Sequence, residues 1–61
     1  MKRADLIRIL EANGYYLKRN GANHDIYWHP DLKLTIPIQR HREIPDAVAQ
    51  AILKQAGIKN Q

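Results

Sequence analysis

The chain has 61 residues, of which 44% are hydrophobic and 26% charged, and it contains three glycines, three prolines and no cysteine. This composition is typical of one small globular domain over residues 1–61 rather than of a disordered segment. Without cysteine there is no disulfide framework, no thiolate nucleophile and no cysteine-based zinc site. Histidine, aspartate and glutamate are left as the main candidates for chemistry.

Ten lysines and arginines against six acidic residues give a net charge of +4. Such a charge attracts polyanions, so nucleic acid is the first candidate partner, ahead of an anionic membrane or an acidic protein. The alternative is that the charge only keeps a small domain soluble. No run approaches the roughly 18 apolar residues of a membrane span, and an acid at position 5 precedes any stretch of signal-peptide length. We therefore expect a cytoplasmic protein with no membrane partner.

The N-terminal segment predicts a helix over residues 3–13. Leu6, Ile7 and Leu10 recur there at helical spacing, so one side of the helix is apolar. Asn13-Gly14 follows as a stop signal, because glycine readily adopts the left-handed conformation that ends helices.

Three short strands follow in the pattern. Residues 15–19 and 24–29 read as strands joined at Asn20-Gly21, a strong hairpin dipeptide. Residues 33–36 alternate polar and apolar side chains, and Pro37 is expected to close this third strand. The strands should form one antiparallel meander.

A loop over residues 38–43 leads to a second helix, with Pro45 at its first position. Gly57 and Ile58 resemble a glycine C-cap with its hydrophobic contact, and residues 59–61 are expected to fray. The predicted buried stripe of this helix is Val48, Ala51, Ile52 and Gln55. The fold class is therefore α+β, a small two-layer domain of helix, three antiparallel strands and helix, with both helices on one face of the sheet.

Alternation along the second strand separates its two faces. One face carries His24, Ile26 and Trp28, and the other carries Asp25, Tyr27 and His29. We expect Ile26 and Trp28 to pack under the helices, which would leave His24 at the rim of the helix-facing side. A rim histidine can act as a general acid or base near neutral pH. The alternative is a half-buried histidine whose ring is satisfied by a backbone carbonyl.

The sequence lacks the patterns typical of metal sites, nucleophilic catalysis and phosphate-binding loops. The three histidines fall on two faces of one strand and in a distant loop, with no spacing typical of metal ligands, so we expect no metal ion. The chain contains no serine or cysteine nucleophile, and no phosphate-loop or dinucleotide motif. We expect no cofactor.

Two basic patches bracket the end of the sheet where His24 is expected. Lys18 and Arg19 precede the hairpin turn, and Arg40 and Arg42 flank His41. These cations suit phosphates on either side of the histidine. The aromatic residues interleaved with them fit either a core or a surface that stacks unpaired bases, and they are Tyr15, Tyr16, Tyr27 and Trp28.

Four segments together resemble HicA-type toxins. They are residues 5–15 (DLIRILEANGY), 23–27 (NHDIY), 35–37 (TIP) and 51–58 (AILKQAGI). The resemblance implies a double-stranded-RNA-binding-domain-like fold and a ribonuclease that acts on mRNA. It also implies neutralisation by a HicB antitoxin, in a hetero-oligomer of toxin and antitoxin.

The family's Gly-Ser-His-x-x-Tyr segment, whose histidine is catalytic, matches this sequence at His24 and Tyr27. Asn23 stands at the serine position. The family's basic segment after the third strand is matched less well, because Ile38 and Gln39 intervene before Arg40 and His41.

The implied chemistry needs few protein groups. RNA carries its own nucleophile in the 2′-hydroxyl, so cleavage requires proton transfer and cations around the phosphate, without a metal ion. His24 is the predicted catalytic residue, and His41, Tyr27 or water would serve as its partner. The predicted RNA-binding residues are Lys18, Arg19, Tyr27, Arg40, His41 and Arg42.

Two rival functions are consistent with the sequence. A non-catalytic RNA-binding module would keep the fold and the basic patches but would not need His24. A DNA-binding domain would need a recognition helix, yet the second helix offers only Gln50, Lys54 and Gln55 as base-reading side chains.

Overall fold

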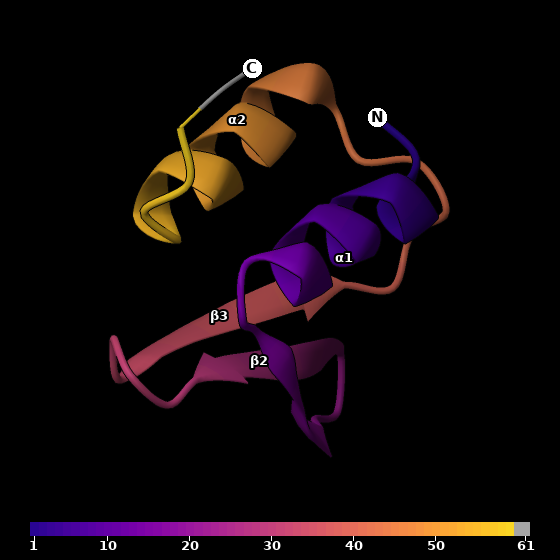
Figure 1. Ribbon diagram of the computed structural model, residues 1–61. Coiled ribbons are helices and arrows are strands. Elements are labelled where there is room, and N and C mark those ends of the chain that lie inside the picture. Colours follow the sequence, from indigo (N-terminus) through magenta and orange to yellow (C-terminus); the bar gives the residue numbers. More distant parts are fainter. Residues whose placement is uncertain (60–61) are drawn as a thin grey trace.

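The computed structural model describes residues 1–59 and contains five elements. In chain order they are α1 (Arg3–Ala12), β1 (Tyr16–Asn20), β2 (His24–His29), β3 (Leu34–Gln39) and α2 (Asp46–Gln55). Both helices lie on the same side of the sheet (Figure 1). The predicted α+β fold class and element order are therefore confirmed. The predicted fraying of residues 59–61 falls mostly outside the described residues. No helix in residues 1–59 combines the length and the apolar character needed to cross a membrane.

The sheet is an antiparallel meander with the strand order β1-β2-β3. The expectation that Pro37 ends the third strand is wrong, because β3 continues through it to Gln39 and pairs Pro37 with Ile26. Proline is tolerated here because β3 is an edge strand, where a missing N–H need not break the ladder. On the opposite edge, a bulge shifts the register of β1 between Leu17 and Arg19.

One face of the sheet packs against the helices. Its central side chains are Tyr27 of β2 and Ile36 and Ile38 of β3, each at most 6% exposed. The whole buried core consists of Leu6, Leu10, Tyr15, Tyr27, Ile36, Ile38, Ile44, Ala49, Ile52, Leu53 and Ala56.

The expected assignment of faces is the reverse of the observed one. The two sets of alternating residues on β2 are correct, but the set containing Tyr27 faces the helices, whereas Ile26 and Trp28 lie on the uncovered face. The helix side therefore also receives Asp25. Its carboxylate is accepted there because Arg3 of α1 pairs with it.

Glycine ends both helices, as expected. At α1 the N–H of Tyr15 donates to the carbonyl of Leu10 and Gly14 has a φ of +93°, and α2 ends in the same way at Gly57. A Cβ at position 14 would lie 2.6 Å from Nε2 of His29. The close approach of the segment after α1 to His29 of β2 therefore also favours glycine at this position.

The second helix differs from the prediction in two details. Pro45 precedes α2 as its N-cap, with extended backbone, and Asp46 is the first helical residue. Of the predicted stripe only Ile52 is buried. Val48 is partly buried, and Ala51 and Gln55 are exposed. The buried residues of α2 are instead Ala49, Ile52 and Leu53, followed by Ala56 at its C-cap. Two of these four are alanines, which a prediction based on large apolar side chains overlooks.

Candidate functional site

His24 begins β2 at the end of the sheet, opposite Gln39 of β3. This position at the end of the sheet agrees with the sequence prediction, but the side chain belongs to the uncovered face and not to the helix-facing side. It is partly buried, in a surface hollow. The lining residues of this hollow are Ala22, Asn23, His24, Gln39, Arg40 and His41. The fold thus brings His24 together with Arg40 and His41, although Arg40 follows His24 by 16 residues in the chain.

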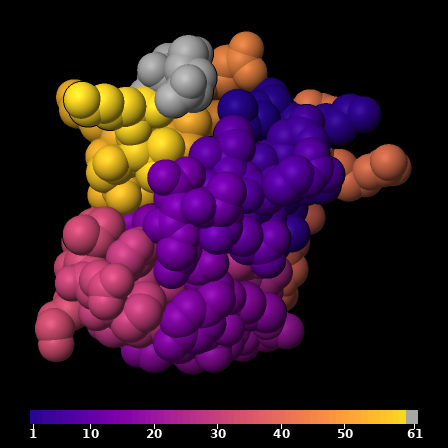
Figure 2. Space-filling model, in the orientation of Figure 1, coloured from indigo at the N-terminus to yellow at the C-terminus, as the bar shows by residue number. Residues whose placement is uncertain are grey.

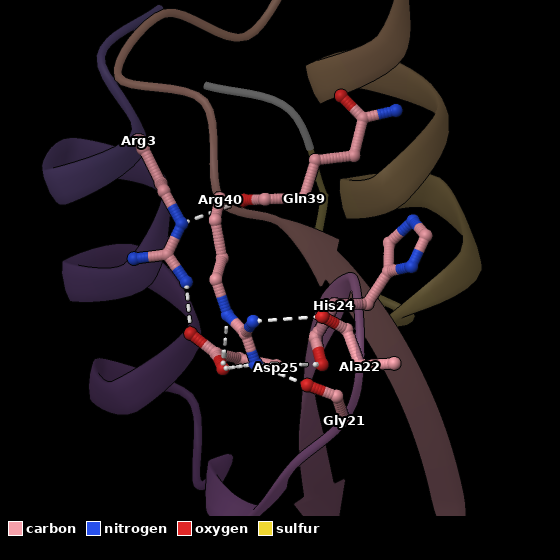
Figure 3. Close-up of polar contacts among 7 residues, drawn as sticks. All are labelled: Arg3, Gly21, Ala22, His24, Asp25, Gln39 and Arg40. Atoms are coloured by element: carbon pink, nitrogen blue, oxygen red, sulfur yellow. Dashed lines mark hydrogen bonds and ion pairs between the residues drawn. The ribbon is translucent and has the colours of Figure 1, made fainter.

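The ring of His24 is free of internal partners. Among the residues that the structure describes, no hydrogen bond involves its imidazole, so the alternative of a ring satisfied by a backbone carbonyl finds no support. In Figure 3 the imidazole points away from the neighbouring arginines. Both ring nitrogens are therefore available for proton exchange with a ligand or with water.

A carboxylate between two arginines lies directly beside His24 in the chain. Asp25 accepts a hydrogen bond of 2.6 Å from Nη2 of Arg3 and one of 2.9 Å from Nε of Arg40 (Figure 3). These two guanidinium groups, with the bond from Arg40 as the larger effect, lower the pKa of Asp25 below its ordinary value. Arg3 also donates to the backbone oxygen of Gln39 at 2.6 Å. The cluster Arg3–Asp25–Arg40 therefore joins α1, β2 and the end of β3.

Arg40 also fixes the turn that carries His24. Its guanidinium donates to the backbone oxygens of Ala22 and His24, at 3.1 and 3.4 Å, and to that of Gly21. Within the turn, the N–H of Gly21 donates to the carbonyl of His24 at 2.7 Å. The sequence predicts that Arg40 binds a phosphate of RNA. In the structure, however, most of its N–H donors are already engaged in hydrogen bonds within the protein.

Lys18 and Arg19 lie on the same uncovered face as His24. Arg19 is paired with Ile26, and the bulge places the Nζ atom of Lys18 4.5 Å from the centroid of the Trp28 ring. Both cations are exposed, so both are accessible to a polyanion. Arg42 is exposed as well and does not line the hollow of His24; it lines a second hollow, with Lys2, Arg3 and Glu43, and Arg40 borders both.

Tyr27 does not belong to this surface. Its side chain is 6% exposed and faces the helices, and burial raises the pKa of its hydroxyl. The predicted RNA contact by Tyr27, and its predicted role as a proton-transfer partner of His24, are therefore incompatible with its position. The matching Tyr of the HicA-like segment is a core residue in this fold.

The remaining histidine, His29, has a structural role. His29 ends β2 at the opposite end from His24 and accepts a hydrogen bond of 3.2 Å from the N–H of Leu32. Its ring meets that of Tyr15 edge to face, with centroids 5.0 Å apart. Across residues 1–59, histidine, aspartate and glutamate side chains form no group of three or more that is placed to hold a metal ion.

Sequence reasoning missed Arg3 and Asp25 as part of the site. Arg3 lies in the first turn of α1, and nothing in its local pattern links it to a residue 22 positions later. Asp25 offered a weak signal, since an acid beside the candidate histidine needs a partner if its strand face is covered.

The sequence of the chain is similar to those of known proteins. Residues 3–58 match the model of a family described as the HicA toxin of bacterial toxin–antitoxin systems. The chain is also 37% identical over 59 residues to a protein of Photorhabdus laumondii named probable mRNA interferase HicA 2, and the match covers 97% of this chain and all of that protein. No solved structure matches the chain.

Proposed function

This chain belongs to the HicA family of toxins, and we propose that it is a cytoplasmic endoribonuclease that cleaves mRNA with His24 as its catalytic residue. The observation that carries the proposal is the unpartnered imidazole of His24 in a hollow shared with His41 and bordered by Arg40. The name of the Photorhabdus relative supports mRNA as the substrate.

The reaction needs one proton removed and one supplied. The 2′-hydroxyl oxygen attacks the adjacent phosphorus, the bond to the 5′-oxygen breaks, and the products are a 2′,3′-cyclic phosphate and a 5′-hydroxyl. One ring takes the proton of the 2′-hydroxyl and another group gives a proton to the leaving 5′-oxygen. His24 fills one of these roles, and His41 is the partner that the hollow supports best, because Tyr27 is buried.

Charge on the phosphate is stabilised from the uncovered face. Arg19 is exposed there, opposite Ile26 and so two positions along β2 from His24, whereas the likewise exposed Lys18 lies farther along the same face, beside Trp28. Cations placed where negative charge develops lower the barrier most, since they need no rearrangement during the reaction. Arg42 contributes longer-range attraction from its separate hollow.

The test is cleavage of RNA in excess EDTA, followed by analysis of the product ends. Because the side chains of residues 1–59 form no metal-ligand cluster, cutting is expected to continue at an unchanged rate and to leave 2′,3′-cyclic phosphates. Cutting that stops in EDTA and returns with magnesium would contradict this mechanism. A parallel reaction with 2′-deoxy substitution at the cleaved position is the control, and it should not be cut.

We also propose that a HicB antitoxin neutralises this protein by covering the His24 end of the sheet. Carboxylates of an acidic partner can occupy the positions that Lys18 and Arg19 offer to phosphates, and the partner would exclude substrate from the hollow. RNA and antitoxin should therefore compete for His24→Ala protein. If RNA stays bound while the antitoxin fully suppresses cleavage by the wild type, inhibition occurs at another surface.

A further inference from the structure

The face of the sheet that the helices leave uncovered carries an aromatic pair in line with His24. Tyr16 of β1 is the cross-strand partner of Trp28 of β2, so both lie on the face of the sheet opposite to the buried Tyr27. Tyr16 is 50% exposed and Trp28 is partly exposed. The two remaining tyrosines, Tyr15 and Tyr27, are at most 6% exposed in the core. The structure thus separates core aromatics from surface aromatics, and Trp28, which the sequence predicted to pack under the helices, is among the surface ones.

We propose that Tyr16, Trp28 and Lys18 form a stacking platform that binds the bases of single-stranded RNA next to the cleaved phosphate. The proposal rests on the ribonuclease function proposed above and deepens it, because it names the class of substrate. Aromatic side chains beside cations bind single strands of many sequences, since every base offers a flat face. Paired bases are stacked inside a duplex and cannot reach such a surface.

The spacing along β2 supports this arrangement. His24, Ile26 and Trp28 alternate onto one face, so His24 and Trp28 lie about 13 Å apart at the strand's rise of about 3.3 Å per residue. Arg19 is paired with Ile26, midway between them. A single strand that follows β2 would therefore stack a base on Trp28, pass its backbone by Arg19 and present a phosphate to His24.

Lys18 has a defined part in the platform. Its ammonium lies 4.5 Å from the centroid of the indole ring, a cation–π contact at an exposed site. An arriving base takes the place of the ammonium over the ring, and the lysine then pairs with the RNA backbone. The ring is thus covered in the free protein and becomes available when a polyanion attracts the lysine.

A control position for the platform lies in the turn that follows β2, outside the strands of the sheet. The turn between β2 and β3, shown in pink in Figure 2, projects beside the surface of α1 and β1. Leu32 lies in this turn and is 52% exposed. It is a large exposed apolar residue like Tyr16 and lies near the same end of β2, but it belongs to neither strand of the platform, so it tests whether any exposed apolar side chain there affects binding.

The test uses the fluorescence of Trp28, which is the only tryptophan of the chain. His24→Ala protein is titrated with a single-stranded RNA oligonucleotide and, separately, with the same sequence as a duplex. The single strand is expected to change the emission in a saturable way and to bind more tightly than the duplex. An unchanged emission at saturation, or equal affinity for the duplex, would overturn the platform.

Substitutions give a second readout. In the His24→Ala background, Trp28→Leu and Tyr16→Leu should each weaken binding of the single strand by on the order of 10-fold. Trp28→Phe should retain most of the affinity and guards against misfolding as the cause. Leu32→Ala should have no effect, and Lys18→Gln should weaken binding more than Lys54→Gln, a matched loss of charge on α2. Equal affinities across all these variants would contradict the proposal.

The outcomes separate this proposal from the function on which it rests. If the wild type cleaves RNA and Trp28→Leu binds RNA normally, the platform proposal is wrong but the ribonuclease function stands. A fluorescence response to RNA without any cleavage would keep the platform and remove the catalytic assignment. If the emission responds to a HicB antitoxin and never to RNA, the face is a protein interface and the proposal is wrong.

Discussion

Replacing His24 by alanine is expected to lower the rate of RNA cleavage by at least about 100-fold, the low end of what a positioned general acid or base contributes. Affinity for RNA and thermal stability should change little, because the imidazole is on the uncovered face and has no internal hydrogen bond among the described residues. The measurement is the single-turnover rate together with growth inhibition on expression. His41→Ala should cause a smaller loss if water can replace its ring.

His24→Gln separates shape from basicity, since glutamine occupies similar space and donates hydrogen bonds but does not exchange a proton near neutral pH. It is therefore expected to be as inactive as His24→Ala. If either variant still arrests growth at matched expression, His24 is structural. The protein would then act as an RNA-binding module without catalysis.

The second large effect is expected from Arg40. Arg40→Ala removes the bonds to Asp25 and to the backbone of the turn at Gly21, Ala22 and His24. The turn then loses its clamp, and misplacement of His24 by about 1 Å is enough to cost on the order of 100-fold in rate. RNA affinity should fall much less, because most donors of Arg40 already serve the protein. A loss confined to affinity, with the rate at saturating RNA unchanged, would make Arg40 a phosphate ligand instead of a positioning residue.

Asp25→Asn tests the same clamp through its pH dependence. The pKa of Asp25 is lowered from its ordinary value of 3.8 in the folded protein, chiefly by Arg40. A carboxyl with a lowered folded-state pKa stabilises the fold above its unfolded pKa, and this stabilisation is lost as pH falls through the folded-state value. The wild type should therefore be more stable than Asp25→Asn at neutral pH, and the gap should narrow as pH falls below about 4. Asp31→Asn, in the exposed turn after β2, is the control and should show no such gap.

The local signals of the sequence predicted the elements well. The stop at Gly14, the strand from His24 to His29 and the glycine cap at Gly57 depend on interactions within a few residues, and all three are confirmed. The face of β2 that is buried depends on the whole sheet. Tyr27 rather than Trp28 is buried because Ile36 and Ile38 lie on the same face of the sheet as Tyr27. The acidic residue on that face, Asp25, is tolerated because Arg3 pairs with it.

The candidate site shows the same division. Chain position was enough to bring His24, Arg40 and His41 to one end of the sheet once three strands were predicted. The internal use of Arg40 was not predictable, since it requires the positions of three backbone oxygens in a turn. The sequence also placed Trp28 on the wrong face, and it left the tyrosines open, because Tyr15 and Tyr16 are neighbours in the chain but only Tyr15 is buried.

The interrupted edges of the sheet restrict how other chains can associate with this protein. An added strand needs a straight row of free N–H and C=O groups, but the bulge between Leu17 and Arg19 breaks the spacing on β1. On β3, Pro37 supplies no N–H at the middle of the strand. Neither edge is therefore a good template for the addition of a strand from another chain. Copies of the free toxin should accordingly resist aggregation by edge-to-edge pairing of their sheets. An antitoxin is accordingly expected to bind side chains on a face of the sheet rather than to add a strand at its edge.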